Sequence, residues 1–168
     1  MASTSSFDVT TGVDYMEVTN AVDQATKEIT QRYDFKGVKA TFELNQKEKK
    51  IVMAAPDDFK LGAMWDSLQG KMVRRGVALQ NLTLGKVEPA AGSTVRQEIA
   101  IQDGLTADMA RAIVKTLKDA KLKKVQAAIQ GDTVRVSSPD KDALQGVIAL
   151  LKQGDYGVEL KFGNFRSN

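Results

Sequence analysis

The chain has 168 residues, of which 42% are hydrophobic and 27% are charged, values typical of a soluble globular protein with one domain or two small ones. It contains no cysteine and no histidine, which excludes disulfides, thiolate nucleophiles, imidazole-dependent triads and the usual zinc sites. No apolar run reaches the roughly 20 residues of a membrane span, and no signal-peptide core follows the polar N-terminus. We therefore expect a cytoplasmic protein without membrane contact that is not an enzyme.

Apolar periodicity predicts six elements in the first half of the chain. Phe7 and Val9 alternate with polar residues, as in a strand, whereas Val18, Val22 and Ala25 recur at helical spacing. The predicted order is a strand, a helix, two strands joined by a turn, a helix and a strand, over residues 7–10, 14–37, 41–44, 51–55, 57–76 and 82–84.

The second half repeats this order. Thr106 and Asp140 are predicted N-caps of two helices, and Gly131-Asp132 predicts a tight hairpin turn. The six elements are predicted over residues 95–101, 106–117, 125–129, 134–136, 140–151 and 158–162.

Both halves read β-α-β-β-α-β, which predicts the α+β class and two tandem ferredoxin-like domains. Each domain should have a four-stranded antiparallel sheet with two helices on one face. The Pro- and Gly-containing stretch 88–93 is the predicted boundary, giving a first domain at 1–90 and a second at 93–168. A terminal strand of one half could also pair with the sheet of the other half.

The positive charge is unevenly distributed along the chain. Residues 1–92 carry 12 Lys/Arg and 12 Asp/Glu, whereas residues 93–168 carry 12 and 9, so the excess lies in the second half. Alternation predicts that Arg135 and Lys161 stand on the uncovered sheet face of the second half together with Glu98, Ala100, Gln126, Ala128, Gln130 and Ser137. The corresponding face of the first half should carry Asp8 and Glu43, which repel an anion, together with Thr10, Thr41 and Thr83. An anionic ligand therefore favours the second half, unless these faces are only solvated or packed on another domain.

Known phosphate-binding signatures are absent, since the sequence has neither a P-loop nor a Gly-x-Gly-x-x-Gly fingerprint. The second-half strands at 124–130 and 133–137 carry no aromatic residue, which weakens an RNA-recognition mechanism based on base stacking. Lysines of the run 115–124 follow a helix C-terminus, where the helix dipole favours them even without a ligand.

Several strings in order resemble the YajQ family, and together they cover nearly the whole chain. They include Ser6-Phe7-Asp8-Val9, the Arg-Tyr-Asp-Phe-Lys-Gly string at 32–37, the string at 118–123, the Val-Gln-Ala-Ala-Ile-Gln-Gly-Asp string at 125–132 and the terminal Asn164-Phe165-Arg166. The resemblance implies a bacterial cytoplasmic protein with two ferredoxin-like domains related to RNA-binding folds. It also implies nucleotide binding without an associated reaction, and cyclic di-GMP as one ligand found within the family.

We predict a non-enzymatic nucleotide-binding protein, with cyclic di-GMP sensing as the finer hypothesis and GTP or ATP as other ligands. Phosphates are predicted to contact Lys121, Lys123, Lys124 and Arg135, with Gln126 on a base or ribose and Arg166 as a further binding residue. No catalytic residue, metal ligand or cofactor is predicted. The alternatives are an RNA- or DNA-binding module and a protein-interaction adaptor.

Overall fold

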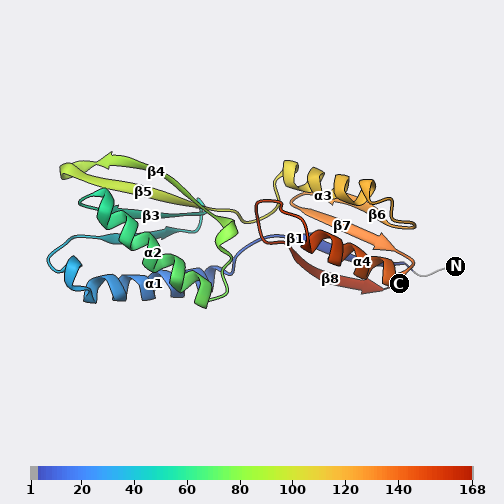
Figure 1. Cartoon of the computed structure of the whole chain (residues 1–168), viewed down its shortest axis with the longest axis horizontal. Coiled ribbons are helices and arrows are strands. Elements are labelled where there is room, and N and C mark those ends of the chain that lie inside the picture. Colours follow the sequence, from blue (N-terminus) through green and yellow to red (C-terminus); the bar gives the residue numbers. More distant parts are fainter. Residues whose placement is uncertain (1–3, 168) are drawn as a thin grey trace. The chain divides into compact units, whose positions relative to one another are not determined.

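The computed structural model describes residues 4–167 and divides into two compact units (Figure 1). Unit 1 contains residues 1–12 and 103–168, and unit 2 contains residues 13–102. Each unit has one four-stranded antiparallel sheet and two α-helices. This confirms the predicted α+β class and the ferredoxin-like architecture.

Unit 2 is built around a sheet with the strand order β2-β3-β5-β4. These strands are β2 (Thr41–Asn45), β3 (Lys50–Ala55), β4 (Leu82–Ala90) and β5 (Thr94–Ile101). Helices α1 (Tyr15–Gln31) and α2 (Asp58–Arg74) contribute Val18, Ala25, Leu61 and Leu68 to one core with Ile51 and Ile99. Because strand side chains alternate between faces, both helices lie on the face that carries Ile51 and Ile99.

Unit 1 has the strand order β6-β7-β1-β8. Its strands are β1 (Ser5–Thr10), β6 (Gln126–Gln130), β7 (Thr133–Ser138) and β8 (Lys161–Ser167). Helices α3 (Ala107–Asp119) and α4 (Lys141–Lys152) cover the face that carries Phe7, Val9, Val134 and Val136. The other face carries the alternate residues of each strand and is not covered by either helix.

The two units do not correspond to the two halves of the chain, so the predicted domains 1–90 and 93–168 differ from the division in the structure. Strand β1 pairs with β7 and β8, and Figure 1 shows this N-terminal strand between two C-terminal ones. Strand β5 pairs with β3 and β4 of unit 2. The pairing of a terminal strand with the other half therefore does occur, and it involves the first strand of each half.

The stretch 88–93, predicted as the boundary between two domains, lies in a β-hairpin of unit 2. Glu88, Pro89 and Ala90 pair with Arg96, Val95 and Thr94, so β4 continues directly into β5 through residues 91–93. The turn forms because Gly92 and Ser93 adopt positive φ values of 69° and 59°. Pro89 is compatible with β4 because β4 is an edge strand, in which the N–H groups that face away from the sheet have no ladder partner to lose.

Local sequence signals at the helix starts are confirmed. The side chains of Asp14, Asp57, Thr106 and Asp140 each accept a backbone N–H in the first turn of their helix. Among residues 4–167, no helix has the length and apolar character of a membrane span.

Candidate functional site

The uncovered face of unit 1 brings polar side chains from three separate chain segments into one row. Gln126 lies opposite Ser137, Ser137 lies opposite Ser6, and Ser6 lies opposite Arg166. These four residues cross all four strands at one end of the sheet, a width of about 14 Å at the usual strand spacing. Lys124 lies just before Gln126, and both line a depression of about 280 Å³ together with Ser137 and Ser138.

We call Lys124, Gln126, Ser137, Ser6 and Arg166 the basic row. It has a cation at each end and hydroxyl and amide groups between them. Lys124, Gln126 and Arg166 are exposed to solvent, so they can reach a ligand without rearrangement of the core. Hydroxyls and an amide donate hydrogen bonds to phosphate oxygens, and Arg can hold a phosphate with two parallel N–H groups. The arrangement therefore suits an anion that also offers polar groups.

Arg135, a predicted phosphate contact, lies in the adjacent row and is already paired. It faces Asp8 across the β1–β7 ladder, and its Nε donates to Asp8 Oδ1 at 2.9 Å. Asn164 donates its side-chain amide to the second carboxylate oxygen of Asp8 at 2.7 Å. Asp8 and Arg135 were predicted on different sheets. The exchange of β1 places them on the same one, so the local charge is neutralised.

Asp8 should make the stability of the protein dependent on pH. The hydrogen bond from Arg135 is the main cause that lowers the pKa of Asp8, with a further contribution from Asn164. A lowered folded-state pKa means that the stabilisation is complete above the unfolded value of about 3.9 and is lost as pH falls through the folded value. We expect the free energy of unfolding to decrease less steeply between pH 5 and pH 2 in Asp8→Asn than in the wild type.

Urea unfolding followed by far-UV circular dichroism at several pH values measures this slope. Asp119→Asn is the control, because Asp119 is an exposed acid on α3, and it should retain the wild-type slope. Equal slopes for the wild type and Asp8→Asn would contradict the prediction.

The loop of residues 120–125 between α3 and β6, which we call the lysine loop, places Lys121, Lys123 and Lys124 at different sites. Lys121 lines a crevice of about 380 Å³ between the end of α3 and β6, together with Lys118, Leu122 and Gln126. Lys124 lines the depression on the uncovered face, and Lys123 is exposed between these two sites. Lys121 and Lys124 have φ values of 52° and 63°, so the loop turns sharply at both positions. Gln126 lines both the crevice and the depression.

The charge difference between the units is smaller than the difference between the halves. Unit 1 carries 11 Lys/Arg and 9 Asp/Glu, and unit 2 carries 13 and 12. Because β1 adds Asp8 to unit 1, the net positive charge of the whole unit is small. Its cations are concentrated in the basic row and the lysine loop.

Charged side chains on the uncovered face of unit 2 form ion pairs with one another. Glu98, predicted on the face with Arg135, lies here with Ala100, because β5 belongs to this sheet. Lys50 and Arg96 both form ion pairs with Glu98, at 3.2 and 2.9 Å. Cations engaged in this way are poor candidates for a phosphate site.

Aromatic side chains lie mainly away from the uncovered face of unit 1. The Phe162 and Phe165 rings both contact the Phe7 ring, with centroids at 6.0 and 5.8 Å, which places them on the helix-covered side. On the central strands β1 and β7, the outward side chains are Ser6, Asp8, Thr10, Thr133, Arg135 and Ser137. These strands offer hydrogen-bonding groups to a ligand and no stacking surface.

Sequence reasoning did not select Ser6, which strand pairing places in the basic row, and it assigned Asp8 to the wrong sheet. Ser137 was predicted on the uncovered face, but its neighbour Ser6 comes from a strand that periodicity assigned to the other half. No local signal identifies this pairing. The acidic pairs at the starts of α2 and α4 cap helices, and residues 4–167 contain no group of three carboxylates placed to hold a metal ion.

Comparison with known proteins gives a consistent picture. A family model described as "Nucleotide-binding protein YajQ-like" matches residues 5–166. A nucleotide-binding protein of Koribacter versatilis is 50% identical over 163 residues, covering 97% of this chain and 98% of that protein. Proteins of the same name from Heliobacterium modesticaldum and Magnetococcus marinus are 48% and 51% identical over 167 and 161 residues. These alignments cover 99% and 96% of this chain and 100% and 98% of the relatives.

Proposed function

Since the chain belongs to the YajQ-like family, we propose that it binds a nucleotide at the basic row of unit 1, as a sensor or effector rather than an enzyme. The observation that carries this proposal is the register, which aligns Gln126, Ser137, Ser6 and Arg166 across the whole sheet. The names of the relatives support a nucleotide as the anion.

In the proposed complex, Arg166 holds a phosphate in a bidentate manner and Lys124 acts as a point charge at the other end of the row. Ser6 and Ser137 donate hydroxyl groups between them, and Gln126 contacts a base or ribose. Lys121 and Lys123 serve as outer cations. Arg135 contributes less than Arg166, because its guanidinium is held by Asp8.

Cyclic di-GMP is the ligand we test first, because it carries two phosphates and the row has a cation at each end. GTP and ATP are the other candidates. Nucleic acid has less support, because the outward residues of β1 and β7 offer no ring on which bases could stack. The alternative of a protein-interaction adaptor concerns a surface of unit 2 and does not involve the basic row.

We expect Lys124→Asn and Arg166→Gln each to raise the Kd for the bound nucleotide about 5- to 10-fold, since each removes one charge-assisted contact. Asn is chosen at position 124 because it tolerates the left-handed backbone found there. Titration calorimetry with cyclic di-GMP, GTP and ATP at two salt concentrations measures the effect.

Lys152→Gln is the matched control, because Lys152 is an exposed lysine in the last turn of α4 outside the basic row. It should leave the Kd unchanged within two-fold. Absence of heat for all three nucleotides at millimolar concentration, or equal effects of all three variants, would reject the proposal.

A further inference from the structure

Unit 2 has a hollow lined by carboxylates and an aromatic ring, in contrast to the cations and hydroxyl groups of the basic row. It has a volume of about 410 Å³ and is lined by Arg32, Asp34, Phe59, Gly62, Ala63 and Asp66. We call it the Phe59 hollow. Its residues come from α2 and from the segment that follows α1, where the short 3₁₀ turn Tyr33–Phe35 begins.

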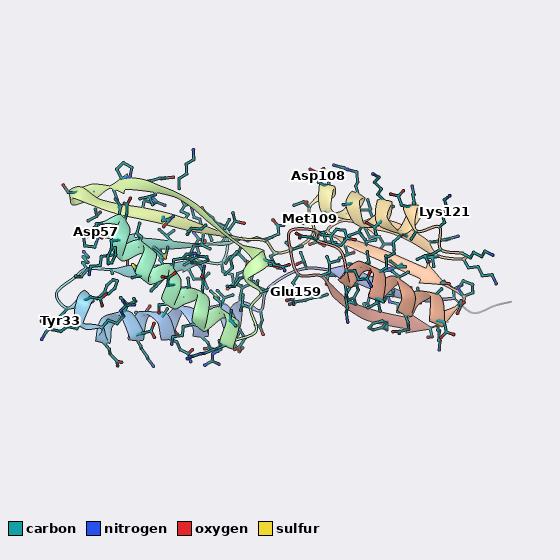
Figure 2. The ribbon with its side chains drawn as sticks, in the orientation of Figure 1. Tyr33, Asp57, Asp108, Met109, Lys121 and Glu159 are labelled. Atoms are coloured by element: carbon teal, nitrogen blue, oxygen red, sulfur yellow. The ribbon has the colours of Figure 1, made fainter. Side chains whose placement is uncertain are left out.

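Two aromatic side chains at this end of unit 2 are unusually exposed. Phe59 has 79% of its surface accessible and Tyr33 has 89%. Figure 2 shows Tyr33 and Asp57, the N-cap of α2, at the same end of the unit. Phe59 is also the second residue of α2, a position where a charged or small polar residue is usual. Phe59, unlike Tyr33, lines the hollow, which gives its ring a concave surface beside it for a ligand.

The cations near the hollow are already engaged within unit 2. Arg32 donates to both carboxylate oxygens of Asp34, at 3.0 and 2.8 Å, and lies 5.4 Å from the centroid of the Phe35 ring. Lys60 donates to the backbone carbonyl of Asp34, and its Nζ also lies over the Phe35 ring, at 4.8 Å from the centroid. These contacts hold the two positive groups beside the Phe35 ring, and the Arg32 guanidinium, which lines the hollow, is already paired with Asp34.

The negative groups exceed these cations. Asp66 lines the hollow, and Asp57 and Asp58 stand at the start of α2 next to Phe59. Within the lining itself, the two carboxylates of Asp34 and Asp66 exceed the single cation Arg32, so the lining has a net negative charge that disfavours a nucleotide phosphate and attracts a cation.

The floor of the hollow is formed by small residues. Gly62 and Ala63 follow Phe59 by about one helical turn, and Asp66 follows by about one more, so all four lie on one side of α2. A Cβ atom built at Gly62 would meet no atom within 4 Å. The hollow is thus open between a phenyl ring at one end and a carboxylate at the other.

We propose that the Phe59 hollow binds an arginine side chain of a protein partner, flanked by an aliphatic residue. A guanidinium is planar, so it can stack on the Phe59 ring, and the Asp66 carboxylate two helical turns along α2 attracts its positive charge. The aliphatic neighbour covers the exposed phenyl edge. This interaction surface is separate from the proposed nucleotide site, so loss of one leaves the other testable.

The probes are the peptides acetyl-Leu-Arg-Leu-amide and its citrulline analogue, which has nearly the same shape without the charge. They are titrated into the full-length ¹⁵N-labelled protein and followed by amide chemical shifts. We expect saturable shifts confined to residues 32–34 and 59–66, with the citrulline peptide binding at least 10-fold more weakly.

Variants of the hollow provide a second readout. Gly62→Leu should fill it and weaken peptide binding at least 10-fold, while the fold is retained because Gly62 is an exposed helix position where an added Cβ atom meets nothing outside its own stretch of helix. Gly70→Leu is the matched control, an exposed glycine of the same helix with the same free space that does not line the hollow. Asp66→Asn should weaken binding about 5- to 10-fold, and Asp23→Asn, an exposed acid on α1, should change it less than two-fold.

Equal binding of the two peptides, shifts that map elsewhere, or no shift at 20 mM peptide would overturn the proposal. Shifts of the same amides on addition of ATP would also overturn it, because they would identify an anion site. Concentration-dependent shifts of these amides without peptide would assign the surface to a second copy of the chain and reject an arginine-bearing partner.

Discussion

Residues 13–102 produced alone are expected to fold, whereas residues 1–90 are expected to remain largely unfolded. The first fragment contains α1, α2 and all four strands of the unit 2 sheet. The second lacks β5, which lies between β3 and β4 and contributes the buried Ile99 and Ile101. Loss of an inner strand leaves two ladders unpaired and exposes the core to water.

Circular dichroism, amide shift dispersion and cooperative urea unfolding distinguish a folded fragment from an unfolded one. A matched test for unit 1 joins Gly12 directly to Asp103. The Gly104 N–H donates to the Thr11 carbonyl at 3.0 Å, so the chain ends are already adjacent. A 1–90 fragment that unfolds cooperatively, with 13–102 disordered, would contradict the exchange of β1 and β5.

Single core substitutions should affect the unit that the structure assigns rather than the half of the chain in which they lie. Ile99→Ala should destabilise unit 2 by about 2–5 kcal/mol, and Phe7→Ala should destabilise unit 1 by about 3–5 kcal/mol. Both side chains are fully buried, in different cores. Trp65, the single tryptophan of the chain, packs against the core of unit 2 and reports on its unfolding.

Urea unfolding followed by Trp65 fluorescence should therefore show a larger shift for Ile99→Ala than for Phe7→Ala. Far-UV circular dichroism, which reports on both units, should show a shift for each variant. If Phe7→Ala shifted the Trp65 transition more than Ile99→Ala did, Phe7 would belong with Trp65, as the linear division of the chain into halves predicts.

The sequence allowed most local structure to be predicted, because periodicity and capping depend on neighbours along the chain. The predicted N-caps Thr106 and Asp140, the alternation of Phe7 and Val9 and the helical spacing of Val18, Val22 and Ala25 all agree with the structure. The predicted fold class followed from the order of these elements.

Strand pairing could not be predicted in the same way. The first strand of each half, β1 or β5, shows the same alternation of apolar and polar residues whether it pairs within its own half or with the other half. Periodicity therefore does not distinguish the two arrangements. The Pro- and Gly-containing stretch 88–93 was interpreted as a domain boundary, although its composition also suits an edge strand and a tight turn.

The part of the candidate site that depends on local sequence could be predicted, whereas the part that depends on strand pairing could not. Lys124, Gln126 and Arg166 lie near the ends of second-half strands that stay in unit 1, so charge and alternation sufficed to select them. Ser6 and the Asp8–Arg135 pair depend on β1, and a residue pair 127 positions apart has no local signature. The Phe59 hollow was missed because helical spacing gives no reason to single out Phe59 at the start of α2.

The location of nucleotide binding is tested most directly by amide chemical shifts of the full-length protein during titration with cyclic di-GMP, GTP and ATP. The basic row predicts that the largest shifts for the bound nucleotide occur at Ser6, Lys124, Gln126, Ser137 and Arg166, with unit 2 unchanged. Arg166→Gln should reduce these shifts at equal ligand concentration. Shifts confined to unit 2, or to the crevice residues Lys118 and Leu122 without the basic row, would contradict the proposed site.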